Sequence, residues 1–440
     1  MPSRRVLILG GGAAGMSAAS RARRLDQGAA ITVLEQTDMV SHAPCAIPYF
    51  FEGLFKDPSL FMTYTPAYFR EKRGIDVKVG ARVVDVDLGS RRVTYKVGTE
   101  TSVMEYDSLI ISTGARPKIP DVPGSLGERV FYVHHPAEAV TQVSRLSSLD
   151  RVAVVGAGVL GVELSEALSS LGKKVTLVHR GPYPLSRMLD PEIGKVVSDR
   201  VGASVSLALN QSLREIRDEG RVVITDSERY EVDGTFITIG IEPSVQFKGL
   251  RLGSSKAIAV NDRMETSVNG VYAAGDVAES VNLITGKPDW QPYAPVANKM
   301  GYVAGANSVG GSMSFPGVVG TVITKFYDKL IAKTGLTLRE AQSAGFKAYE
   351  TTIKARSRAH YYPGGKDIWV TLVAEEGTRR LLGGQLVGEE EILGRVDLLA
   401  LAVSKGLTAQ DLFFVEMGYM PAVAGVWDPL IIAARQLMRE

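Results

Sequence analysis

The sequence contains one glycine-rich pattern twice, and this repeat limits the possible folds more than any other feature. The first copy follows an apolar run at residues 5–9 and the second follows one at residues 151–155. The glycines are Gly10, Gly12 and Gly15 in the first copy and Gly156, Gly158 and Gly161 in the second. A buried strand, a turn of this kind and a helix form a dinucleotide-binding unit of a parallel sheet. The sequence therefore predicts two nucleotide-binding units.

In the first unit, each glycine has its own task. Gly10 permits a tight turn, Gly12 lets the backbone approach a pyrophosphate, and Gly15 lets the helix pack closely on the strand. The next predicted strand, residues 30–35, ends in Glu35, whose carboxylate would accept hydrogen bonds from ribose hydroxyls. A glycine-rich turn without a ligand is the alternative, but strand, helix and acid together predict a nucleotide site.

The second unit differs at the position of that acid. Aligning the two copies places His179 where Glu35 stands, and Arg180 follows it. An acid repels a 2′-phosphate, whereas His179 and Arg180 offer hydrogen-bond donors and positive charge. This favours NADPH, with use of both cofactors as the main alternative. In a third interpretation, Arg180 only faces solvent.

Composition excludes several classes of protein. Cys45 is the only cysteine, so an internal disulfide and a thiolate zinc site are impossible. The five histidines show no metal-ligand spacing, and we expect no metal. Lys+Arg 50 against Asp+Glu 48 gives a net charge of +2, which does not suggest nucleic-acid binding. No apolar run reaches the roughly 18–20 residues of a membrane span. The N-terminus resembles a secretory signal, but the glycine pattern explains it better, so we expect a cytoplasmic protein.

Several segments resemble those of flavoprotein disulfide reductases, in the same order. They are DSLIISTGARP (107–117), TFITIGIEPS (235–244) and VNGVYAAGDVAES (268–280), with Asp276 near the ribityl chain or phosphates. SHAPCAIPY (41–49) resembles the redox segment of the single-cysteine FAD-dependent pyridine nucleotide-disulfide oxidoreductases. That family includes coenzyme A (CoA) disulfide reductases, NAD(P)H oxidases and peroxidases, and sulfur or persulfide reductases. Residues 334–346, 360–364 and 418–429 resemble its dimerisation domain, which implies a homodimer.

The resemblance and the strand–helix alternation predict the fold class and the domains. We expect an α/β protein with two Rossmann-like, doubly wound nucleotide-binding domains and an α+β C-terminal dimerisation domain. The predicted ranges are 1–115 and 241–320 for a split FAD domain, 116–240 for the NAD(P) domain, and 321–440 for the dimerisation domain.

The lone cysteine limits the chemistry. Cys45 can cycle with electrons only by pairing with a small thiol in a mixed disulfide, or as a sulfenic acid or persulfide. The nucleophile is the thiolate, so we expect positive charge or a dipole to lower its pKa. The alternative is a buried, inert cysteine.

The subfamily is indicated by the first glycine loop. Oxidases and peroxidases of the family usually carry a histidine in this loop, where this chain has Ala13. This favours a CoA disulfide or sulfur reductase over an oxidase that reduces oxygen, which stays the alternative. A redox-sensing flavoprotein that acts by binding a partner is a hypothesis of another class.

The resemblance also implies individual site residues. The reactive cysteine is Cys45, and Tyr419 with Tyr361 or Tyr362 would reach the active site across the dimer interface as a general acid. The CoA contacts are Ser17, Arg21, Arg24, Ser41, Lys72 and Arg73, although Pro44 replaces the family's usual asparagine. The FAD contacts are Gly10, Gly12, Ala13, Ala14, Gly15, Glu35, Gln36, Val83, Thr113, Gly114, Gly275 and Asp276. The NADPH contacts are Gly156, Gly158, Val159, Leu160, Gly161, Glu163, His179, Arg180 and Gly240.

Overall fold

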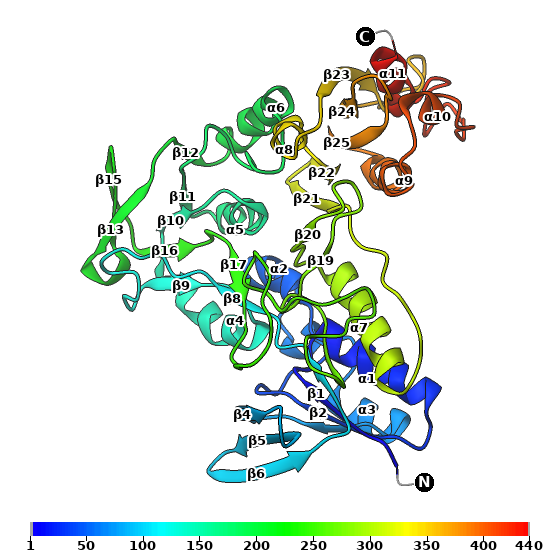
Figure 1. The fold of residues 1–440 in the computed structure, drawn as a ribbon. Helices are drawn as coiled ribbons and strands as arrows, with labels where there is room; N and C mark the ends of the chain where they lie inside the picture. The colour runs from blue at the N-terminus through cyan, green and yellow to red at the C-terminus, as the bar shows by residue number, and fades with distance from the viewer. Residues whose placement is uncertain (1–2, 439–440) are drawn as a thin grey trace.

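A computed structural model describes residues 3–438, which contain three five-stranded sheets (Figure 1). The first sheet is parallel, in the order β18-β7-β1-β2-β3. Its strands are β1 (Arg5–Leu9), β2 (Ala30–Leu34), β3 (Asp76–Lys78), β7 (Ser108–Ile111) and β18 (Val271–Ala273). Helix α1 (Ala13–Leu25) packs against α7 (Ala294–Ser308), and both contact β7. Segments more than 150 residues apart in the chain thus meet in one sheet.

The second sheet is also parallel, in the order β12-β11-β10-β16-β9. Its strands are β9 (Val130–Tyr132), β10 (Arg151–Val155), β11 (Lys174–His179), β12 (Ser206–Leu209) and β16 (Gly234–Ile237). Its helices are α4 (Pro136–Gln142), α5 (Val159–Ser170) and α6 (Pro191–Gly202). The second glycine pattern lies between β10 and α5, as the first lies between β1 and α1.

The chain passes between the two parallel sheets twice, and the two crossings pair with each other. β8 (Ala115–Pro117) and β17 (Ile241–Pro243) form an antiparallel ribbon. Each parallel sheet also has a small antiparallel companion. These are β4 (Ala81–Asp87), β5 (Arg92–Val97) and β6 (Glu100–Glu105), and β13 (Leu213–Arg217), β14 (Val222–Thr225) and β15 (Arg229–Glu231).

The third sheet is antiparallel and lies in the C-terminal part, in the order β21-β22-β25-β24-β23. Its strands are β21 (Val322–Phe326), β22 (Lys329–Gly335), β23 (Ala348–Arg356), β24 (Asp367–Glu375) and β25 (Leu381–Gly388). The accompanying helices are α8 (Leu338–Ser343), α9 (Ile392–Ser404), α10 (Ala409–Phe413) and α11 (Pro429–Leu437). The predicted fold class, α/β with an α+β C-terminal part, is confirmed.

Two short helices carry the segment that contains the cysteine. A 3-10 turn at Pro44–Ala46 leads into α2 (Ile47–Glu52), which ends where Gly53 adopts φ +85°. Helix α2 packs against α5 of the second sheet, and α3 (Pro66–Arg73) follows. Within residues 3–438, no helix combines the length and apolarity needed to cross a lipid bilayer.

Candidate functional site

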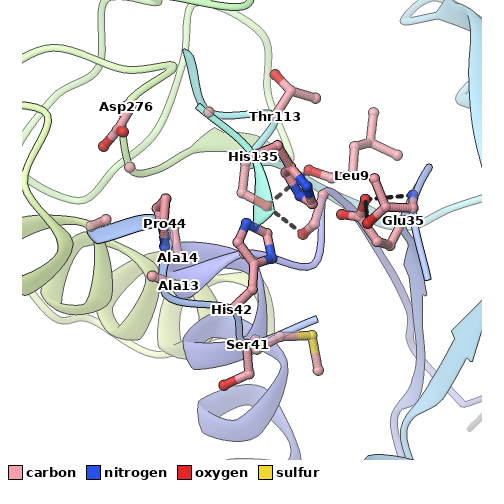
Figure 2. Close-up of a pocket in the computed structure, with 18 of the residues that line it drawn as sticks. Leu9, Ala13, Ala14, Glu35, Ser41, His42, Pro44, Thr113, His135 and Asp276 are labelled. Atoms are coloured by element: carbon pink, nitrogen blue, oxygen red, sulfur yellow. Dashed lines mark hydrogen bonds between the residues drawn. The ribbon is translucent and has the colours of Figure 1, made fainter. Parts of the chain in front are cut away.

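A cavity of about 980 Å³ lies at the carboxyl ends of the first sheet's strands. Leu9, Leu34, Ser112 and Ala274 line it, each at or just after the end of a strand. In an open parallel sheet this edge is the usual place for a ligand. Figure 2 shows this region. All predicted FAD contacts line the cavity except Gly15, which lies beneath the loop.

The first glycine loop is tightly packed on one side and open on the other. Gly10 has φ +97°, and a Cβ atom on Gly15 would lie 1.9 Å from the carbonyl oxygen of Gly10. The Ser112 hydroxyl donates to the carbonyl of Leu9 at 2.8 Å and to that of Gly10 at 3.0 Å. A Cβ on Gly12 would meet only His42, at 3.8 Å. The loop therefore leaves room for a ligand at Gly12 and at the N-terminus of α1.

The carboxylate of Glu35 is largely engaged in fixing this loop. Its Oε2 accepts the Gly11 N–H at 2.8 Å, and its Oε1 accepts the N–H and hydroxyl of Thr37 at 2.8 and 2.9 Å. A carboxylate has about four acceptor sites, so capacity remains for a ribose hydroxyl. The open face of Gly12, the helix N-terminus and this acid fit the adenosine diphosphate half of FAD.

The second glycine loop repeats this construction. Gly156 has φ +109°, and a Cβ on Gly161 would lie 1.9 Å from its carbonyl oxygen. The Thr238 hydroxyl donates to the carbonyls of Gly156 at 2.7 Å and Val155 at 3.1 Å, as Ser112 does in the first loop. Space beside Gly158 is open. These residues fit a second dinucleotide.

His179 occupies the position of Glu35 and does the same structural task. Its Nδ1 accepts the Ala157 N–H at 3.3 Å, so in the neutral ring Nε2 carries the proton and donates to Ser186 Oγ at 3.0 Å. Burial, with Arg180 and Arg187 nearby, lowers the pKa of His179 to about 4. Both ring nitrogens are thus engaged within the protein. Of the predicted pair, the exposed Arg180 is left to offer positive charge.

Cys45 lines the same cavity as the first loop, and its side chain is exposed. The surrounding atoms, and the carboxylates of Glu163 and Asp276, raise the pKa of its thiol. This differs from our expectation of a lowered pKa, because desolvation of the thiol by the surrounding atoms is the largest effect and the nearby charges are negative rather than positive. Burial also raises the pKa of Asp276, to about 6.

Helix α5 is attached to the C-terminal sheet. The carboxylate of Glu163 accepts the hydroxyl of Thr324 at 2.7 Å, and Glu166 forms an ion pair with Lys325. Both partners lie on β21. Burial raises the pKa of Glu163. The second nucleotide loop is therefore held by contacts with the third sheet.

The far end of the cavity is cationic and aromatic. Arg24 and Arg73 line it together with Tyr64 and Tyr68, whose rings stack with centroids 4.6 Å apart. The guanidinium of Arg73 donates to the Tyr68 hydroxyl at 3.3 Å. Ser17 and Ser41, two further predicted CoA contacts, also line the cavity.

The structure does not bring every predicted CoA contact to the cavity. Arg21 leaves it, because its guanidinium lies over the ring of Tyr302 at 4.3 Å and contacts the sulfur of Met313. Lys72 is exposed outside the cavity lining.

The predicted catalytic tyrosines are exposed in the C-terminal part. The hydroxyls of Tyr361 and Tyr419 are hydrogen-bonded at 2.9 Å, although the residues are 58 positions apart. Tyr362 is outside this pair. None of the three lines the cavity that contains Cys45 of the same chain. The structure thus brings two of the tyrosines together, but within one chain it does not bring them to the cysteine.

Sequence reasoning missed three histidines of the cavity. His42, His134 and His135 line it, and the rings of His42 and His135 have centroids 4.3 Å apart (Figure 2). Of the three, only His42 lies in a segment with a recognisable motif, SHAPCAIPY (41–49). Within residues 3–438 there is no group of metal-ligating side chains that could hold an ion.

Comparisons with known proteins agree with this geometry. Residues 4–301 match the family model described as pyridine nucleotide-disulphide oxidoreductase, and residues 321–430 match the dimerisation domain of that family.

Relatives with curated names and a solved structure are similar over almost the whole chain. The NAD(P)H coenzyme A polysulfide/persulfide reductase of Pyrococcus horikoshii is 43% identical over 99% of this chain and 98% of its own length. An NADH oxidase of Methanocaldococcus jannaschii is 33% identical over 99% of both chains. The structure of an NAD-dependent persulfide reductase from A. fulgidus superposes with a TM-score of 0.96 at 33% identity, over 99% of this chain and 83% of that one.

Proposed function

This chain belongs to the pyridine nucleotide-disulphide oxidoreductase family, and we propose that it is an NAD(P)H-dependent flavoprotein that reduces CoA-linked sulfur. The substrate is CoA disulfide or a related polysulfide or persulfide. The observation that carries the proposal is the content of one cavity. It joins the FAD-type glycine loop, the single cysteine Cys45, and a cationic end with Arg24 and Arg73.

The first chemical step falls to Cys45. Its thiolate attacks one sulfur of CoA disulfide, forming a mixed disulfide and releasing the other CoA as a thiolate. FAD bound in the cavity would transfer an electron pair from the nicotinamide to that mixed disulfide. The second CoA then leaves and Cys45 returns to a thiolate, so that each NADPH yields two thiols. Since its described neighbours raise the pKa of the Cys45 thiol, bound groups or a second subunit must favour the thiolate.

A proton is needed at each departing sulfur. In the homodimer that we propose, the Tyr361–Tyr419 pair of one subunit faces Cys45 of the other. The Tyr361–Tyr419 hydrogen bond raises the pKa of Tyr419, so the Tyr419 hydroxyl stays protonated at neutral pH and holds the proton that a departing sulfur needs. Tyr419→Phe with unchanged kinetics would contradict this role.

The arrangement supports a division of the chain and a choice of nucleotide. We keep the predicted ranges, 1–115 with 241–320 for FAD, 116–240 for the nicotinamide, and 321–440 for dimerisation, and a cytoplasmic location. NADPH is the proposed donor because Arg180 and Arg187 are the positive charges near the ring of His179.

The test is anaerobic oxidation of NADPH with and without CoA disulfide, with the released thiols counted. We expect oxidation only with the disulfide, two thiols per NADPH, and loss of both in Cys45→Ser while NADPH still bleaches the flavin. NADPH oxidation with CoA disulfide that releases no thiol would refute the proposal. Activity with polysulfide alone would assign the sulfur branch of the same proposal.

An NAD(P)H oxidase is the second candidate, favoured by the similarity to the M. jannaschii NADH oxidase. Ala13 leaves the first loop without the histidine that this activity usually has in the family. If oxygen supports rapid NADPH oxidation in wild type and in Cys45→Ser alike, an oxidase activity replaces the proposed reductase activity.

A further inference from the structure

The cavity contains a group of side chains to which the proposed reaction gives no task. His42 precedes the cysteine turn, and His134 and His135 lie between β9 and α4. All three line the cavity, and the rings of His42 and His135 are in contact. We call these three residues the imidazole wall. Because they come from segments about 90 residues apart, their meeting is a product of the fold.

One member of the imidazole wall, His42, lies beside the loop where a diphosphate would lie, and His135 contacts the ring of His42. The nearest atom to a Cβ built on Gly12 is Cε1 of His42, at 3.8 Å. Gly12 is the N-cap of α1, where free N–H groups and the helix dipole favour an anion. A group in the open space at Gly12 therefore has the N-terminus of α1 on one side and the ring of His42 on another.

The described residues supply little other positive charge at this place. Arg24 lies near the opposite end of α1, about 16 Å along the axis from Ala13. Arg116 is paired with Glu242 at 2.9 Å. The ionisable groups that share the cavity with the imidazole wall are Glu35, Glu138, Asp276, Cys45, Tyr64, Tyr68, Arg24, Arg73 and Arg116. Two phosphate charges need more compensation than half a charge from a helix N-terminus.

We propose that the imidazole wall binds the diphosphate of FAD and takes up a proton when FAD binds. This goes beyond the proposed reaction and would hold whether the acceptor is sulfur or oxygen. His135 has a free donor for such a contact. Its Nδ1 accepts the N–H of Ala137 at 3.1 Å, which leaves the proton on Nε2 as a donor.

The charge state of the wall agrees with proton uptake. Burial lowers the pKa of His42, and burial together with repulsion from neighbouring imidazoles lowers the pKa of His134 and lowers that of His135 to about 3. The rings are therefore neutral without a ligand. Glu35 acts in the opposite direction on His42, and a diphosphate would do so more strongly. FAD binding should therefore become tighter as the pH falls. Uptake of one proton changes the dissociation constant about tenfold per pH unit.

The experiment measures FAD release, not turnover. The holoenzyme is diluted between about pH 5.5 and 8, and the fluorescence of released FAD gives the dissociation constant. We compare wild type with His42→Gln and His135→Gln, which keep an amide N–H but cannot be protonated. We expect each variant to bind FAD about tenfold more weakly near pH 6, and to match wild type within about twofold near pH 8.

Asp276 titrates in the same window, so it needs its own control. Its pKa is raised to about 6, and its protonation also favours an anion. Asp276→Asn should keep most of the pH dependence, whereas the histidine variants should lose it. If instead the histidine variants keep the wild-type slope and Asp276→Asn loses it, the proposal is overturned.

Two further measurements keep the test decisive. If a histidine variant does not fold, we count the protons that wild type and Asp276→Asn release per FAD in weakly buffered solution. If Asp276→Asn releases no proton with its FAD, proton uptake by the histidines is refuted. CoA also carries a diphosphate, so CoA is titrated into each holoenzyme. Unchanged CoA affinity in His42→Gln assigns the wall to FAD, and a loss confined to CoA affinity would overturn that assignment.

Discussion

The paired glycine loops allow one perturbation to be made twice, with different expected outcomes. A methyl group on Gly15 would lie 1.9 Å from the Gly10 carbonyl oxygen, whereas ordinary contact begins at 3.4 Å. The same values hold for Gly161 and Gly156. Either Gly→Ala substitution must therefore displace a helix start relative to its loop by roughly 1.5 Å. Overpacking of this kind costs about 1–3 kcal/mol, and a loss of that size at the loop weakens a ligand roughly 5- to 150-fold.

Each variant should lose one nucleotide only. Gly15→Ala should be isolated with little FAD, seen as lost flavin absorbance, and should recover it only at high added FAD. Gly161→Ala should keep its flavin but require a much higher NADPH concentration to bleach it in anaerobic stopped flow. A melting curve for each variant shows that the chain has folded. Full flavin content in Gly15→Ala, or unchanged NADPH dependence in Gly161→Ala, would refute the reasoning.

Three further predictions concern charge. Burial and the Asp190 carboxylate raise the pKa of Glu350 from 4.5 to about 7, so between these pH values the folded chain holds a proton that the unfolded chain has lost. The free energy of unfolding should therefore fall as the pH rises through this range, and Glu350→Gln should flatten the calorimetric profile of Tm against pH over the same range. The Arg395–Asp428 pair is buried with a contact of 2.7 Å, so Arg395→Met should cost about 3–5 kcal/mol in urea unfolding, and a loss below 1 kcal/mol would contradict its burial. Arg180→Ala should raise the KM for NADPH by about tenfold and leave that for NADH nearly unchanged; equal changes would remove the phosphate contact.

Most of the fold could be predicted because its signals are local. A glycine loop, the strand before it and the helix after it occupy fewer than 30 consecutive residues, and the packing that requires glycine at Gly15 arises within that stretch. The residue at the end of the second strand is also within reach, so Glu35 and His179 were correctly aligned. What could not be predicted is that His179 would accept the Ala157 N–H. That depends on the direction of an imidazole ring.

The rest of the site depends on contacts between distant segments. Arg21 and Arg24 share a helix face in sequence, but α7 places Tyr302 beneath Arg21 and removes it from the cavity. The imidazole wall joins two segments about 90 residues apart, and neither contains a periodic pattern that indicates a shared cavity. Spacing along the chain can identify a loop that closes on itself, but not a side chain whose neighbours come from elsewhere.

The hydroxyls of Ser112 and Thr238 tie the two glycine loops to their sheets by the same pair of bonds. The side chain that differs between the units, Glu35 or His179, adds a further contact, because it accepts an N–H of the same loop. Exchanging Glu35 or His179 would therefore leave the hydroxyl anchors in place but remove a contact that helps to hold the loop. The two nucleotide units thus fix their loops in the same way, and the exposed Arg180 is a position at which nucleotide preference can be altered without loosening the second loop.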